Sequence, residues 1–423
     1  MGLLKEADYA SVNFGDDPTS VDYERVFYAR RPILEIAVKN FLENQSFQAD
    51  FKHFEKSNRL WLDDFAEFMA IKEHFGNQAL QKWDDKKAVA RDPSALEKYR
   101  TMLAEQIQYF KVTQYFFFKQ WTELKNYANQ KGIQIIGDMP IYVAADSVEV
   151  WTKPELFQLD EERNPLFVAG VPADQFSATG QLWGNPLYAW EEHKKQGYAW
   201  WIHRIEESFK IYDVLRIDHF KGFSDYWQVD GKAEVAKDGS WQPGPGYDLF
   251  KAVKEQLGDL PIIAEDLGNI DDKARKLLTD CNYPGMKILQ FGFEDVSGES
   301  LDSPHYCIPH SIVYTGTHDN DVTNGWYNSL TEQQQQYIND YTHRHEDESI
   351  CQAMIRQLFA TVSNTAIATM QDVLDLPASS RMNVPSTIGG NWQWRMQQSD
   401  LTQDKKDFLA KMTTLYQRAN QEK

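Results

Sequence analysis

Four acidic side chains lie at or just after short apolar runs of the kind that form buried strands. Asp138 lies in IIGDMP, Asp218 in LRIDHF, Glu265 in IIAEDLG and Asp319 in TGTHDND. Because parallel strands of α/β folds present their ligand site at their carboxyl ends, we expect these side chains to converge. A single acidic residue after a strand could instead cap the following helix. Taken together, the four favour an active site built on carboxylates.

Two of these carboxyl groups have neighbours that suit different tasks. Arg216 and Asp218 are two residues apart on one strand, so they face the same side and can form an ion pair that favours a charged nucleophile. Glu265 follows an apolar run, and partial burial there would raise its pKa toward that of a general acid. Such a pair suits glycoside cleavage. Asp319, next to His318, could stabilise an oxocarbenium-like transition state.

The elements that must position these residues begin at about residue 131, where short apolar runs alternate with helical patterns. This alternation is typical of successive βα units and a parallel sheet, and so of an α/β fold. Six runs read as strands: 132–143, 212–220, 260–268, 286–293, 310–321 and 365–374. Between them, Gly258 is predicted to end a helix over 247–257, and Asp271 is predicted to cap a helix running to Cys281.

The chain divides by pattern into two parts. Residues 1–130 contain charge-rich helical stretches and no strong strand, which predicts a mainly helical subdomain with a helix that leads into the strands of 131–423. A long connection at about 144–200 carries VAGVPADQFSATGQLWGNP, with Phe176 and Trp183 among its glycines and prolines. Connections of this length are usually functional, although an ordered surface excursion would also account for it.

Composition excludes several partners. The formal net charge of −19 would repel phosphate backbones and anionic lipid heads, so nucleic acid and membranes are poor partners and a neutral ligand fits better. Three cysteines without close pairing favour a cytoplasmic protein and offer no zinc site. We expect neither a cofactor nor a bound metal.

Six segments resemble, in order and spacing, the amylomaltase or disproportionating-enzyme family of 4-alpha-glucanotransferases: GDMPIYV, FSATGQLWGNPLY, LRIDHFKGF, IIAEDLG, TGTHDND and RMNVPSTIGGNW. The resemblance spans about residues 1–415. RIDHF and THDN are shared with wider α-amylase relatives, whereas FSATGQLWGNP and RMNVP are specific. It implies a (β/α)8 TIM-type barrel with helical insertions, acting on maltooligosaccharides and alpha-1,4-glucans by a retaining double displacement.

The resemblance also implies a role for each motif residue. Asp218 would be the nucleophile, Glu265 the general acid/base and Asp319 the transition-state stabiliser. The substrate-binding residues would be Asp138, Arg216 and His318 around the donor sugar, with Gln181 and Trp183 on a loop that contacts the glucan.

A closed barrel needs eight parallel strands, and the sequence shows six. Proteins of this family carry a further N-terminal segment before the point that matches GLLKEADYASVNF, so we expect the barrel to be incomplete here. Two other functions remain open at this point. Asp138, Glu265, His318 and Asp319 are an acceptable ligand set for Mg²⁺ or Mn²⁺ in a metal-dependent barrel enzyme. A catalytically silent glucan-binding fragment would keep the pocket without turnover.

Overall fold

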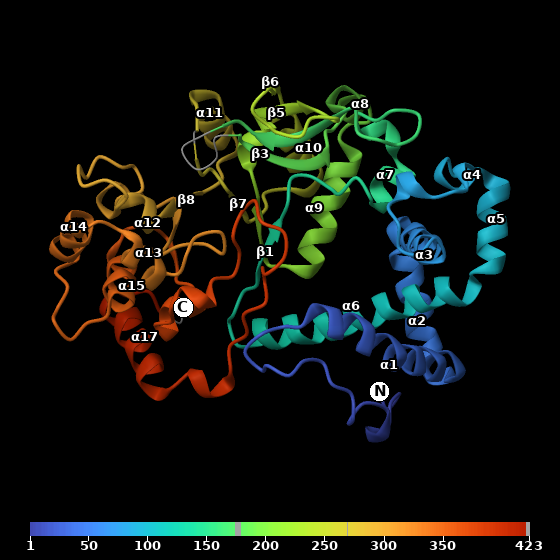
Figure 1. Cartoon of the computed structure of the whole chain (residues 1–423), viewed down its shortest axis with the longest axis horizontal. Coiled ribbons are helices and arrows are strands. Elements are labelled where there is room, and N and C mark those ends of the chain that lie inside the picture. Colours follow the sequence, from blue (N-terminus) through green and yellow to red (C-terminus); the bar gives the residue numbers. More distant parts are fainter. Residues whose placement is uncertain (174–178, 269, 420–423) are drawn as a thin grey trace. The chain divides into compact units, whose positions relative to one another are not determined.

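The structure is a computed structural model that describes residues 1–173, 179–268 and 270–419 (Figure 1). The chain forms two compact units. The first comprises Met1–Ser11 and Arg31–Tyr283, and the second comprises Val12–Arg30 and Pro284–Lys423. No helix in the described ranges has the length and apolar character needed to cross a membrane.

Every named element up to residue 130 is a helix (blue to teal in Figure 1). The elements are η1 (Glu6–Asp8), α1 (Tyr23–Glu43), η2 (Gln45–Phe47), α2 (Gln48–Ser57), α3 (Arg59–His74), η3 (Leu80–Lys82), α4 (Lys86–Val89), α5 (Pro93–Met102) and α6 (Ala104–Gln130). Asp85 and Asp92 cap α4 and α5 by accepting backbone N–H bonds. Phe41 packs against Phe51 and Phe116, which joins α1, α2 and α6 through aromatic contacts.

A parallel sheet of three strands occupies the first unit, in the order β1 (Ile136–Met139), β4 (Val214–Ile217), β7 (Ile262–Ala264). Residues Leu215, Ile217 and Ala264 are fully buried, as apolar strands with helices beside them should be. Between the strands lie α9 (Ala199–Ile211) and α10 (Tyr247–Leu257), and α11 (Asp272–Cys281) follows β7. The predictions for α10 and α11 are confirmed, because Gly258 ends α10 with φ +80° and the Asp271 carboxylate accepts from the N–H of Ala274.

The described residues of the connection at 144–200, which leave out 174–178, form short elements of their own: α7 (Val148–Thr152), η4 (Pro154–Leu156), β2 (Phe167–Val171), β3 (Gln181–Pro186) and α8 (Trp190–Lys195). After β4 come η5 (Phe220–Phe223), β5 (Asp225–Asp230) and β6 (Ser240–Pro243). Strands β2 and β3 of this connection pair with β5 and β6 in one antiparallel sheet, in the order β3-β2-β5-β6. The sequence did not reveal this sheet, because β3 mixes polar and apolar residues without alternation and is partly exposed.

The second unit holds another parallel sheet, in the order β10 (Thr365–Ile367), β9 (Ser311–Tyr314), β8 (Gly285–Ile288). Its remaining elements are α12 (Leu289–Gly292), η6 (Pro304–Tyr306), α13 (Thr323–Ser329), α14 (Glu332–Thr342), α15 (Ile350–Ala360), α16 (Met370–Leu374), η7 (Ala378–Ser380), η8 (Gln398–Asp400) and α17 (Gln403–Leu415). Val313, Met354 and Leu358 are fully buried in its core.

Each of the six runs predicted as a strand contains one, so the α/β class is confirmed. In the described residues the six strands form two parallel sheets of three. These pairings do not by themselves make a closed barrel, and the TIM-type barrel stays a prediction.

Candidate active site

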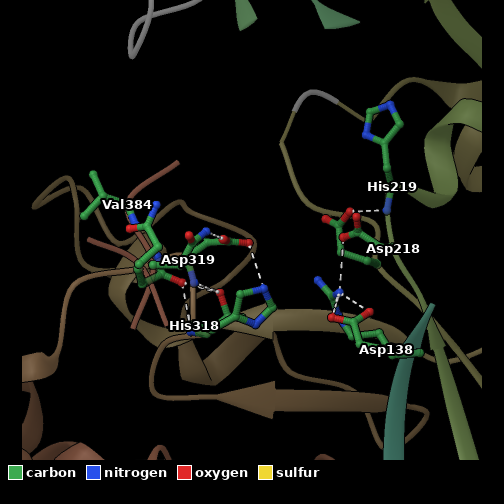
Figure 2. A network of polar contacts seen from close by, with 12 residues as sticks. Asp138, Asp218, His219, His318, Asp319 and Val384 are labelled. Atoms are coloured by element: carbon green, nitrogen blue, oxygen red, sulfur yellow. Dashed lines mark hydrogen bonds and ion pairs between the residues drawn. The ribbon is translucent and has the colours of Figure 1, made fainter. Parts of the chain in front are cut away.

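The end of the first parallel sheet carries a buried guanidinium shared by two carboxylates (Figure 2). Asp138 on β1 is the direct partner of Arg216 on β4 in the strand register. Arg216 Nη1 donates to both carboxylate oxygens of Asp138 at 2.7 Å and to Asp218 Oδ1 at 3.2 Å, which confirms the predicted ion pair. Burial alone would lower the pKa of Arg216, but Asp138 and Asp218 more than offset it and the pKa is raised. The cation therefore stays charged and holds both carboxylates in place.

Glu265 follows β7, the next strand of the sheet. Its Oε2 accepts from the backbone N–H of His219 and its Oε1 accepts from that of Leu267, both at 2.8 Å. Burial, together with the charge of Asp218, raises the pKa of Glu265 to about 7, against the opposing effects of Arg216 and the two N–H bonds. The rise predicted from the apolar run is confirmed, and a carboxyl group with this pKa can both give and take a proton at neutral pH.

His219, which the sequence did not single out, joins the two strand ends. It has φ +49°, a left-handed conformation uncommon for a residue with a side chain. Its own N–H binds the Glu265 side chain, and the N–H of Phe220 donates to the Glu265 carbonyl at 3.0 Å. Burial lowers the pKa of His219 to about 4, so the ring is neutral at pH 7. Residues held in sparsely populated backbone conformations cluster at functional sites. The order of residue types along the chain does not reveal the φ of His219, so the sequence could not identify this residue.

The predicted glucan-contacting residues lie next to this junction. The Trp183 ring meets the His219 ring edge-on at 4.8 Å, and Trp183 Nε1 donates to Gln181 Oε1 at 3.3 Å. Trp183 is 37% exposed, so part of its indole is open to a ligand. Phe176, from the same motif, lies outside the described residues.

The second unit holds its own polar network after β9 (Figure 2). His318 Nε2 lies 3.3 Å from Asp319 Oδ2, while Asn383 Nδ2 donates to Asp319 Oδ1 at 2.6 Å. The Asn383 N–H donates to the His318 carbonyl at 3.1 Å, and Arg381 Nη2 donates to the Asp319 carbonyl at 2.7 Å. The sequence offered a signal for Arg381 and Asn383, because both belong to the RMNVP motif, but it did not assign them a role.

The predicted residues therefore fall into two groups. Asp138, Arg216, Asp218 and Glu265 gather at the ends of adjacent strands in the first unit, with Gln181 and Trp183 beside them. His318 and Asp319 form an ordered pair in the second unit. In the first group, Asp218 is bound to the Arg216 cation and Glu265 has a raised pKa. A charged carboxylate and a carboxyl group of raised pKa are the two groups that glycoside cleavage requires.

Comparison with known proteins agrees with this chemistry. A family model described as 4-alpha-glucanotransferase matches residues 2–402. The chain is 52% identical over 421 residues to a 4-alpha-glucanotransferase of Streptococcus pneumoniae serotype 4, covering 99% of this chain and 83% of the relative. It is 41% identical over 420 residues to that of Clostridium butyricum, covering 98% and 85%. The solved structure of an amylomaltase from Streptococcus agalactiae in complex with acarbose aligns with TM-score 0.98 at 57% identity, covering 99% of this chain and 84% of that one.

Proposed function

The chain belongs to the 4-alpha-glucanotransferase family, and we propose that it transfers alpha-1,4-glucan segments between maltooligosaccharides by a retaining double displacement. The observation that carries this mechanism is the pair formed by Asp218, bound to Arg216, and Glu265, whose pKa is raised to about 7. The metal-dependent and catalytically silent alternatives are not favoured, since the similar proteins are named as enzymes of glucan transfer.

In the first step, Asp218 attacks the anomeric carbon while Glu265 gives its proton to the glycosidic oxygen. The carbon–oxygen bond breaks, the shortened glucan leaves with the proton, and the donor segment is held as an ester of Asp218. In the second step, Glu265 takes a proton from an acceptor hydroxyl, whose oxygen attacks the same carbon and releases Asp218. Two inversions give retention of configuration.

The remaining motif residues would bind the sugar. Asp138 and Arg216 offer hydrogen bonds at the strand ends, and Gln181 and Trp183 offer an amide and an indole face for a sugar ring.

In a (β/α)8 barrel containing all six parallel strands, Asp319 would join Asp218 and Glu265 and stabilise the positive charge of the transition state, beside His318. The near-complete structural match to an amylomaltase supports this barrel. The three cysteines, all of them described and free of disulfide bonds, support a cytoplasmic location.

Product analysis with maltotriose tests the function. We expect glucose and maltooligosaccharides longer than the substrate, with no added metal and no effect of a chelator, because the mechanism uses carboxyl groups alone. Chain lengths can be followed by chromatography. Loss of activity on addition of the chelator would indicate a metal-dependent enzyme. Formation of glucose and maltose without longer products would indicate hydrolysis instead of transfer.

The pH dependence follows from Glu265. The first step needs the protonated form, and raising the pH through about 7 removes that proton. We therefore expect kcat/KM for maltotriose to fall above pH 7, approaching about tenfold per pH unit. Initial rates between pH 5 and 9 measure the profile. A value of kcat/KM that stays constant up to pH 9 would contradict the assignment of Glu265 as the acid.

A further inference from the structure

A cavity of about 470 Å³ in the first unit is lined by residues that have no part in the mechanism above. It is lined by Lys221, Asp225, Trp241, Pro243, Asp271 and Lys273. Its volume is within the range of about 300–1,000 Å³ that is usual for small-ligand sites. The types of its lining residues indicate which ligand it fits.

One face of the β5–β6 ribbon supplies an aromatic platform. The antiparallel register pairs Asp225 with Pro243 and Trp227 with Trp241, so these four side chains share one face. Trp227 is buried, donates through Nε1 to the Ala236 carbonyl at 2.7 Å, and contacts the Trp241 ring edge-on at 5.2 Å. The Trp241 ring therefore packs against Trp227, while 44% of the residue remains exposed.

The charged residues of the cavity balance one another. Lys221 Nζ lies 2.6 Å from Asp271 Oδ2 and 4.7 Å from the centroid of the Trp241 ring. Lys273 Nζ lies 3.3 Å from Asp225 Oδ1. An ionic ligand would have to disrupt an ion pair, whereas a neutral polyhydroxy ligand can bond to both ammonium and carboxylate groups while it stacks on the indole. The cavity therefore suits a sugar better than an anion or a cation.

The position of the cavity links it to the reaction centre. Lys221 follows Asp218 by three residues, and Asp271 follows Glu265 by six. Because consecutive Cα atoms are about 3.8 Å apart, the Cα atoms of Asp218 and Lys221 are separated by at most about 11 Å. A glucan that is bound at Asp218 and has further sugar units can therefore extend to this cavity.

We propose that this cavity is a remote glucan subsite, in which Trp241 stacks on a sugar ring of a longer alpha-1,4-glucan while the two ion pairs bond to its hydroxyls. The subsite rests on the proposed function and adds a preference for long over short substrates.

The test is the Trp241→Ala substitution in the full chain. We expect the ratio of kcat/KM for maltoheptaose to kcat/KM for maltotriose to fall about three- to tenfold, the usual contribution of one aromatic contact. Trp241→Phe should keep most of the ratio because it keeps a ring. Tyr127→Ala is the matched control, since Tyr127 on α6 is also an exposed aromatic residue, at 61%, with the Lys131 ammonium 5.7 Å from its ring centroid.

Lys273→Ala is a second test in case Trp241→Ala does not fold. The Lys273 side chain is 75% exposed, so its removal should not disturb the fold. We expect it to lower the ratio about two- to threefold, as loss of one hydrogen bond to a sugar would. If the ratio is unchanged in both variants, including the case in which activity on both substrates falls equally, the subsite is overturned. Calorimetric binding of the two sugars gives the same comparison without turnover, so the subsite can be judged even if the unsubstituted enzyme fails to transfer glucan, which would refute the proposed function instead.

Discussion

Replacing Asp218 with Asn is expected to lower kcat for glucan transfer by about 10⁴-fold or more, while maltotriose still binds. The amide is nearly isosteric with the carboxylate but is a poor nucleophile, so no glycosyl-enzyme ester forms. It can still lie near the Arg216 guanidinium, which Asp138 also binds. Transfer rates and calorimetric binding, measured on one preparation, separate the two effects.

Asp259→Asn is the matched control for that experiment. Its side chain is 85% exposed and pairs with Lys254 at the surface, so its loss should leave kcat unchanged. If Asp218→Asn retained substantial activity while the control behaved normally, the nucleophile would have to be reassigned.

Replacing Glu265 with Gln is expected to lower kcat by about 10²–10⁴-fold, the usual contribution of general acid–base catalysis, and to remove the decline of kcat/KM above pH 7.

The same substitution should stabilise the fold at alkaline pH. The pKa of Glu265 in the folded chain, about 7, lies above the ordinary value of 4.5, so the folded state holds the proton more strongly than the unfolded chain does. The contribution of Glu265 to the free energy of unfolding is therefore fully present below pH 4.5 and is lost as the pH rises through 7.

Glutamine carries no charge and avoids this loss. We expect the free energy of unfolding at pH 8 to rise by on the order of 1 kcal/mol, less than the whole linkage contribution because one amide oxygen must replace two carboxylate oxygens as acceptor. Denaturant titrations at pH 5 and pH 8 measure it. Glu255→Gln, on the exposed side of α10, is the control. A variant that is inactive and also less stable at pH 8 would point to a structural role for Glu265.

Much of the fold was readable because it depends on local composition. The six parallel strands are apolar runs bounded by turn residues, and the caps of α10 and α11 are a glycine and an aspartate with clear local reasons. The antiparallel sheet could not be predicted, because the residues of β3, which pairs with β2, do not alternate in hydrophobicity. Pairing of this kind is decided by tertiary contacts more than by local preference.

The candidate site divides in the same way. Arg216 and Asp218 could be paired from the sequence because a strand places residues two apart on one face. His219 could not be found, since its contribution is a backbone N–H aimed by an unusual φ and not a side-chain property. Asn383 lies 64 residues beyond Asp319, and no local rule connects them.

The sharing of one guanidinium by Asp138 and Asp218 also bears on which sugars the site admits. Two carboxylates against one cation leave this end of the sheet with a net negative charge while Glu265 is protonated. A phosphorylated sugar would bring like charge into a partly buried place, where repulsion is weakly screened, whereas an unmodified glucan meets no such penalty. We therefore expect the ion pair of Arg216 with Asp138 and Asp218 to disfavour binding of sugar phosphates at this end of the sheet.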